Sequence, residues 1–151
     1  MVKDTIKYTI TYEHVKNLVS IAAEMVKSST WKPDVIVGLT RGGLVPAVMF
    51  SHELNVPLSV FDISLLDKKT LSLPVETLIM RLTNKRVLVV DDINDTGDTI
   101  RIVRNYMAGI DCKFYCIVNN IRSGEVINIH SIAIDKKKEN IWVVFPWEKD
   151  V

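Results

Sequence analysis

Hydrophobic residues along this chain fall into two alternating patterns, short apolar runs and amphipathic segments with helical spacing. Apolar runs rich in β-branched residues predict buried strands, and apolar residues three and four positions apart predict helices with one buried face. The expected strands cover residues 34–39, 58–63, 86–90 and 113–119, with a short one at 132–134. The expected helices are one capped by Thr11 and running through Val26, one at 44–54 and one at 99–107.

The order of these elements predicts an α/β fold. Strands that alternate with helices favour a parallel, doubly wound sheet. Residues 64–74 are polar and irregular, which is typical of a loop; it either closes over a site or simply connects two elements. The run Lys136-Lys137-Lys138 is expected in a solvated turn. Because no repeat or linker divides the chain, residues 1–151 are expected to form a single domain.

Composition narrows the possible functions. The 48% hydrophobic content indicates a packed core, and a net charge of +1 provides no field that would attract nucleic acid or an anionic membrane. Cys112 and Cys116 fall on one face of an expected strand, where free thiols pack as small apolar groups. No apolar run is as long as a signal peptide's apolar region or a membrane span. Stable membrane insertion is therefore not expected, and the expected location is the cytoplasm.

The segment with the most chemical information follows the strand at 86–90. Asp91 and Asp92 come directly after it, and Asp95-Thr96-Gly97-Asp98-Thr99 leads into the next helix. Ligands of α/β proteins bind at the carboxyl ends of strands, and the free N–H groups of a helix start bind phosphate. Gly97 permits the tight turn, and the two threonines add hydroxyl donors. The acids suit a ligand that also carries ribose hydroxyls and a divalent cation.

This segment resembles the phosphoribosyl diphosphate (PRPP) signature of type I phosphoribosyltransferases, an apolar strand, two acids, two variable residues and Asp-Thr-Gly-x-Thr. A receiver domain also has paired acids after its first strand, but too few residues follow Asp92 here to complete one. The resemblance implies that Asp91 and Asp92 hold the ribose and Mg²⁺. It also implies that Asp95 is catalytic and that the 5′-phosphate is bound by Asp95, Thr96, Gly97, Asp98 and Thr99.

A second glycine turn, Thr40-Arg41-Gly42-Gly43, also lies between a strand and a helix. Its glycines let backbone amides approach an anion, and Arg41 offers a fork of donors, although the segment is also compatible with an ordinary connection. With Leu44-Val45-Pro46 it resembles the diphosphate-binding loop of bacterial xanthine-guanine phosphoribosyltransferases. The resemblance implies a cis peptide at Thr40–Arg41 or Arg41–Gly42. Diphosphate contacts are then expected from Thr40, Arg41, Gly42, Gly43, Lys68 and Lys69.

The C-terminal segment Trp142-Val143-Val144-Phe145-Pro146-Trp147 resembles the ending of the same enzymes, which forms a small base-binding hood. There the first tryptophan stacks on the purine, a role that matches Trp142, while Trp147 is expected to be core. The family's lysine that binds the 6-oxo group aligns with Asn120, with Arg122 as the alternative contact, and its acid near the 2-substituent aligns with Val144. The expected base-binding residues are therefore Asn120, Arg122, Trp142, Val143 and Val144.

The resemblance implies a purine phosphoribosyltransferase with the type I fold, which uses PRPP and Mg²⁺ on hypoxanthine, guanine or xanthine in purine salvage. We also expect a homo-oligomer. Two alternatives stay open: a regulator that binds PRPP or a nucleotide on the same fold, and a phosphoribosyltransferase for adenine or a pyrimidine. The near-neutral charge and the lack of a basic stripe disfavour a nucleic-acid-binding regulator.

Overall fold

The computed structural model describes residues 3–63 and 73–149. Five strands form a fully parallel main sheet in the order β3-β2-β4-β5-β6. These strands are β2 (Val35–Leu39), β3 (Leu58–Phe61), β4 (Arg86–Asn94), β5 (Asp111–Asn120) and β6 (Ile129–Ile134). The helices are α1 (Tyr12–Ser28), α2 (Leu44–Leu54), α3 (Leu73–Leu82) and α4 (Asp98–Tyr106). The prediction of a parallel α/β sheet is confirmed.

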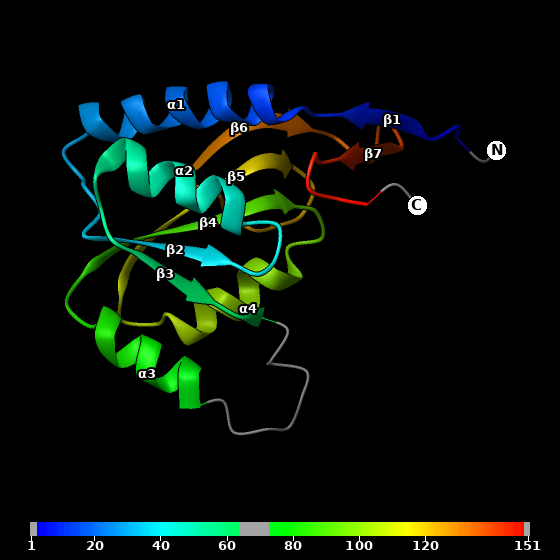
Figure 1. Ribbon diagram of the computed structural model, residues 1–151. Coiled ribbons are helices and arrows are strands. Elements are labelled where there is room, and N and C mark those ends of the chain that lie inside the picture. Colours follow the sequence, from blue (N-terminus) through cyan, green and yellow to red (C-terminus); the bar gives the residue numbers. More distant parts are fainter. Residues whose placement is uncertain (1–2, 64–72, 150–151) are drawn as a thin grey trace.

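The helices cover both faces of the main sheet, α1 and α2 on one side and α3 and α4 on the other (Figure 1). Successive residues of β4 serve the two sides in turn: Leu88 and Val90 belong to the core under α1 and α2, whereas Val87 and Val89 pack with α3 and α4. Such a strand has no polar face, which explains its unbroken apolar run. Cys116 is buried in the second core, Cys112 packs against it, and both are free thiols as predicted.

Three elements were absent from the expectations. Helix α3 begins at Leu73, inside the segment predicted to be loop, and buries Val75, Leu78 and Leu82 at helical spacing. Strands β1 (Ile6–Thr9) and β7 (Ile141–Val144) form a separate two-stranded parallel sheet. All four residues of β1 are exposed, so the strand carries no burial pattern that a sequence reading can detect. The short strand expected at 132–134 begins earlier, at Ile129.

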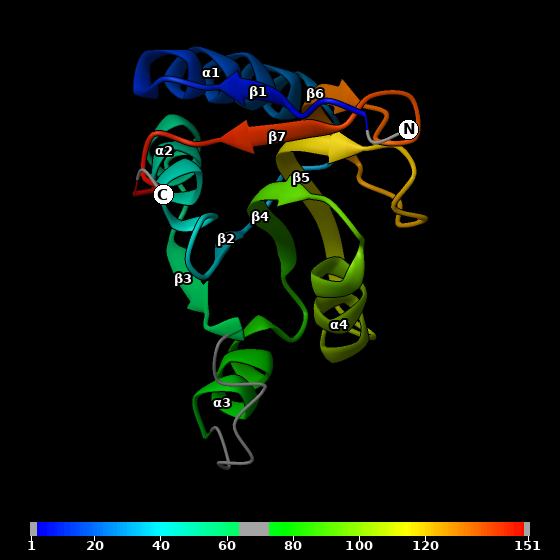
Figure 2. The same cartoon turned by 90° about the vertical axis from the view of Figure 1, so that its right-hand side faces the viewer.

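The β1–β7 sheet unites the two ends of the chain. It lies near the carboxyl ends of the main-sheet strands, where the loops after β4 and β5 emerge (Figures 1 and 2). The C-terminal hood predicted from the resemblance is therefore completed by an N-terminal strand. Within residues 3–63 and 73–149, none of the helices has the length and apolarity to cross a membrane.

Candidate active site

A cleft of about 310 Å³ opens at the carboxyl ends of β2 and β4. These two strands are neighbours in the sheet, although β3 lies between them in the sequence. The cleft is lined by Thr40, Arg41, Gly42, Ile63, Asp91, Asp92, Ile93, Asn94, Asp95, Thr96, Gly97 and Thr99. Two sequence segments that were singled out separately therefore face the same space.

The loop after β2 approaches β4 closely. Thr40 is joined to Arg41 by a cis peptide bond, one of the two positions that the resemblance implies. The Thr40 hydroxyl donates to Asp62 Oδ1 at 2.9 Å and accepts the N–H of Ile63, which ties the loop to the end of β3. A Cβ added to Gly42 would overlap the carboxylate of Asp92, so only glycine allows this approach.

Two adjacent carboxyl groups occupy the end of β4. Asp91 is buried, and burial raises its pKa well above the usual range, with the neighbouring Asp92 raising it further. Burial also raises the pKa of Asp92, although hydrogen bonding lowers it in part; the N–H of Ile93 donates to Asp92 Oδ1 at 2.8 Å. Buried carboxylates of this kind are stabilised by a cation.

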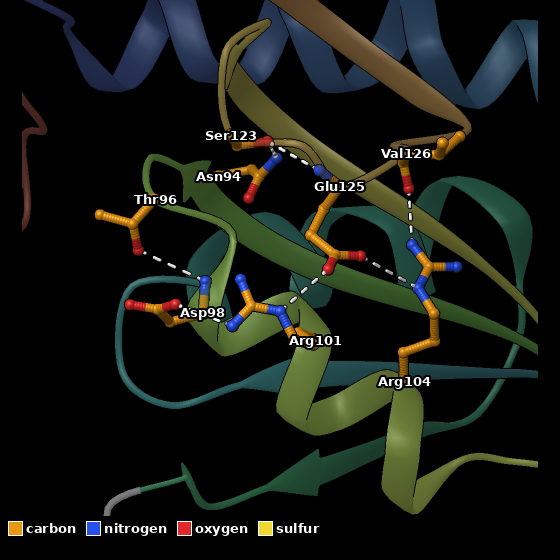
Figure 3. Close-up of polar contacts among 8 residues, drawn as sticks. All are labelled: Asn94, Thr96, Asp98, Arg101, Arg104, Ser123, Glu125 and Val126. Atoms are coloured by element: carbon orange, nitrogen blue, oxygen red, sulfur yellow. Dashed lines mark hydrogen bonds and ion pairs between the residues drawn. The ribbon is translucent and has the colours of Figure 1, made fainter.

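The segment after these acids forms the start of α4. Gly97 has a φ of 90° and is the N-cap of the helix, so the cap residue itself has no side chain to accept from the first amides. The Thr96 hydroxyl accepts the N–H of Asp98 at 3.3 Å, and Asp98 itself turns away to pair with Arg101 (Figure 3). Thr96, Gly97 and Thr99 line the cleft, so the positive end of the helix dipole faces it. This arrangement suits a phosphate group.

The loop between β5 and β6 contacts this helix start. No pattern in the sequence had identified this loop. Glu125 pairs with Arg101 at 3.3 Å and Arg104 at 3.5 Å, both on α4. The buried Asn94 side chain donates to Ser123 Oγ at 2.7 Å (Figure 3). It also donates to Asn119 Oδ1 at 2.9 Å. The loop at 123–125 thus holds both the end of β4 and the first turns of α4.

The expected base-binding residues do not line the cleft. Trp142 is 61% exposed on β7, Val143 is core, and Val144 is half-buried. Asn120 is buried and donates to the backbone carbonyl of Asp95 at 2.9 Å. Arg122 makes two hydrogen bonds to Asp135, at 3.0 and 2.7 Å.

Other expected positions are distributed as follows. Gly43 caps α2 and lies behind the cleft-lining loop, where a Cβ would overlap the β4 backbone. Lys68 and Lys69 lie outside the described residues. Trp147 stacks on Phe145 with ring centroids 5.1 Å apart, which confirms its packing role. Lys136 is in a turn as predicted, but the expectation that it is solvated is wrong: its side chain is 26% exposed and pairs with Asp95 at 2.7 Å.

The carboxyl groups of Asp91 and Asp92 suit a cation that is also bound by a ligand better than a metal ion held by the protein alone. Among residues 3–63 and 73–149, no group of three or more His, Cys, Asp or Glu side chains is placed to hold a metal ion. Magnesium, however, is commonly bound by one or two carboxylates together with substrate phosphates and water. Asp91 and Asp92, both at the cleft, match that incomplete set.

Comparison with known proteins gives a consistent family assignment. The family model of the phosphoribosyl transferase domain matches residues 8–150. A purine phosphoribosyltransferase from Pyrococcus horikoshii is 31% identical, covers 96% of both chains and superposes with a TM-score of 0.77. Two others share the fold. A hypothetical protein from Neisseria gonorrhoeae with bound ppGpp has 19% identity, 99% and 92% coverage and a TM-score of 0.74. The Helicobacter pylori xanthine-guanine-hypoxanthine phosphoribosyltransferase has 15% identity, 97% and 93% coverage and a TM-score of 0.68.

Proposed function

Because the chain belongs to the phosphoribosyl transferase domain family, we propose that it transfers the phosphoribosyl group of PRPP to a purine base. The products are a nucleoside 5′-monophosphate and diphosphate. The observation that carries the proposal is the cleft itself, which unites a helix start suited to an anion, a glycine loop, the buried Asp91 and the half-buried Asp92. The purine assignment is supported by the similarity to the Pyrococcus purine enzyme.

PRPP is bound through its two anionic ends. The amides and hydroxyls of Thr96, Gly97 and Thr99 receive the 5′-phosphate, with Asp95 and Asp98 completing that loop. The loop from Thr40 to Gly43 receives the diphosphate, whose growing charge Arg41 and the backbone amides stabilise as the bond to the anomeric carbon breaks. The expectation that Lys68 and Lys69 assist there stays a prediction.

Asp91 and Asp92 lie between these two anion sites. In this proposal they accept hydrogen bonds from the ribose hydroxyls and would hold Mg²⁺ together with PRPP. The metal would supply positive charge to the diphosphate leaving group. Because Asp91 is buried and Asp92 beside it is half-buried, the two carboxyl groups favour the magnesium complex of PRPP over free PRPP, which is more negatively charged.

Asp95 faces the base from the margin of the cleft. It accepts a hydrogen bond from the imidazole edge of the purine, or removes its proton, while a ring nitrogen attacks the anomeric carbon. Trp142, on the β1–β7 sheet, offers an exposed ring on which the base stacks. The base contact expected from Asn120 stays a prediction, because the buried side chain of Asn120 donates to the backbone carbonyl of Asp95.

A panel of bases tests this function directly. Hypoxanthine, guanine, xanthine, adenine and uracil are each incubated with the protein, PRPP and Mg²⁺, and diphosphate release is measured. The expected result is release that depends on a purine and on Mg²⁺, and that is lost in Asp95→Asn. If PRPP binds tightly but no base supports release, the chain is a PRPP-binding regulator. Turnover of uracil alone would make it a pyrimidine enzyme. The same preparation tests the expected homo-oligomer by light scattering, and the cytoplasmic location stays a prediction.

A further inference from the structure

Three charged side chains are linked at the start of α4. The carboxylate of Asp98, the first residue of the helix, lies 3.1 Å from a terminal nitrogen of the Arg101 guanidinium. Nε of the same guanidinium lies 3.3 Å from Oε1 of Glu125, which is in the loop between β5 and β6. Arg101 therefore lies between two acids and binds each through a different nitrogen (Figure 3).

Glu125 fixes the position of Arg101. The side chain of Glu125 is 18% exposed, whereas that of Asp98 is 68% exposed. Glu125 also pairs with Arg104, one turn further along α4, at 3.5 Å. A guanidinium is a planar fork of donors, so binding its Nε sets the direction of the other nitrogens. Glu125 is therefore the anchor of this row, and Arg101 connects the anchor to Asp98.

Asp98 carries a negative charge beside the helix start that suits a phosphate. A carboxylate in the first turn of a helix is attracted to the positive end of the dipole and to the free N–H groups, and so is a phosphate. Gly97, the N-cap, has no side chain that could occupy those groups. Thr96, Gly97 and Thr99 line the cleft, but Asp98, which lies between them in the sequence, does not. The Asp98 carboxylate is bound by Arg101 instead.

We propose that Arg101 is a positioning residue for PRPP, which keeps the Asp98 carboxylate away from the helix start that receives the 5′-phosphate. This inference rests on the proposed function. Without Arg101, the carboxylate would compete with the phosphate for the same N–H groups and would repel it. An exposed ion pair three residues apart on a helix contributes little to folding stability. An effect of Arg101 on PRPP affinity can therefore be separated from an effect on stability.

The first test compares Arg101→Met with Arg104→Met by calorimetric titration with PRPP and Mg²⁺. Both arginines lie on α4 and pair with Glu125, and Arg101 is the one bound to Asp98. Arg101→Met is expected to bind PRPP roughly 3- to 10-fold more weakly at low salt, and the difference should shrink as salt screens the charges. Arg104→Met should retain the wild-type affinity. Urea unfolding shows that each variant is folded under the conditions of the titration.

The second test is the double variant Asp98→Asn/Arg101→Met. Asparagine keeps the size of the Asp98 side chain and removes its charge, so the double variant is expected to regain most of the PRPP affinity that Arg101→Met loses. If Arg101 bound the phosphate directly, removing the charge of Asp98 would not repair the loss. A double variant as weak as Arg101→Met, or equal losses in Arg101→Met and Arg104→Met, overturns the proposal.

Ribose 5-phosphate separates this inference from the proposed function. It carries the 5′-phosphate without the diphosphate, so its affinity reports on the phosphate site alone. Arg101→Met is expected to bind it more weakly than the wild type and the double variant do. If that order holds while no base supports diphosphate release, the proposed transfer fails and the role of Arg101 stands. If a purine supports release but all these proteins bind ribose 5-phosphate equally, the role of Arg101 is overturned and the proposed function stands.

Discussion

Replacing Gly97 with alanine probes the helix start that we propose binds the 5′-phosphate. Gly97 has a φ of 90°, which side-chain-bearing residues rarely adopt, and an added Cβ would lie 2.8 Å from Ser123 O and 2.8 Å from Glu125 Cγ. Gly109 provides a matched control at the other end of α4. Its φ is 84°, but an added Cβ meets nothing within 4 Å. The two substitutions therefore share the backbone strain and differ in the contact with the loop at 123–125.

The expected losses of stability differ accordingly. The left-handed conformation costs a non-glycine residue about 1–2 kcal/mol, and this is the whole effect expected for Gly109→Ala. Gly97→Ala adds the cost of displacing a backbone carbonyl and the Glu125 side chain, about 1–3 kcal/mol for overpacking of this kind. A combined loss of about 2–5 kcal/mol is a large part of the roughly 5–15 kcal/mol that stabilises a typical domain.

Urea unfolding of the wild type and both variants measures these free energies of unfolding. Equal m-values would show that all three proteins expose the same amount of surface when they unfold. Calorimetric titration with PRPP and Mg²⁺ then measures binding under conditions in which all three proteins are folded. Gly97→Ala is expected to bind PRPP at least about tenfold more weakly, since its amides must move. Gly109→Ala should retain wild-type affinity. Equal losses of stability in the two variants, or unchanged PRPP affinity in Gly97→Ala, would refute the reasoning.

Three other substitutions test separate parts of the site. Asp95→Asn should lower kcat more than it raises the KM for PRPP, because its carboxylate acts on the base; an effect confined to KM would make it a positioning residue. Trp142→Ala should raise the KM for the base roughly 5- to 160-fold, from a stacking energy of about 1–3 kcal/mol, and an unchanged KM would remove Trp142 from the proposed base site. Arg122, paired with Asp135, holds the pKa of that carboxyl at about 2. In Arg122→Gln an NMR titration should show this pKa rising toward its usual value. The stability that the pair contributes is present above about pH 4 and disappears as the pH falls through 2, so the variant and the wild type should converge in stability at the acid end.

The two segments proposed to bind PRPP, which the structure brings to one cleft, could be singled out from the sequence because the residues of each are contiguous. Asp91 to Thr99 is one strand, one turn and one helix start, and each residue type has a local reason to be there. The same holds for Thr40 to Gly43. The sequence could not predict that these two segments lie close together. The contact between Gly42 and the Asp92 carboxylate exists because β2 and β4 are neighbours in the sheet.

Lys136 illustrates why other parts could not be predicted. It is the first of three consecutive lysines, and nothing in their residue type distinguishes it from Lys137 or Lys138. The difference comes from the register of β5 and β6, in which Asn120 pairs with Ile134. That pairing brings Lys136, two residues beyond Ile134, to the end of β5 and within reach of Asp95. Strand order and register are tertiary properties that no local pattern carries.

The topology also explains why a sequence pattern could identify the segments proposed to bind PRPP but not those proposed to bind the base. The chain runs from β2 to the edge strand β3 and then returns to place β4 on the other side of β2, so connections diverge between β2 and β4. A crevice forms outside the strands at such a switch point, and the two loops that border it each follow directly from a strand. The proposed base side has no such continuity, because Asp95 follows β4 whereas Trp142 lies on β7. The proposed base contacts therefore depend on how the strands are assembled rather than on one motif.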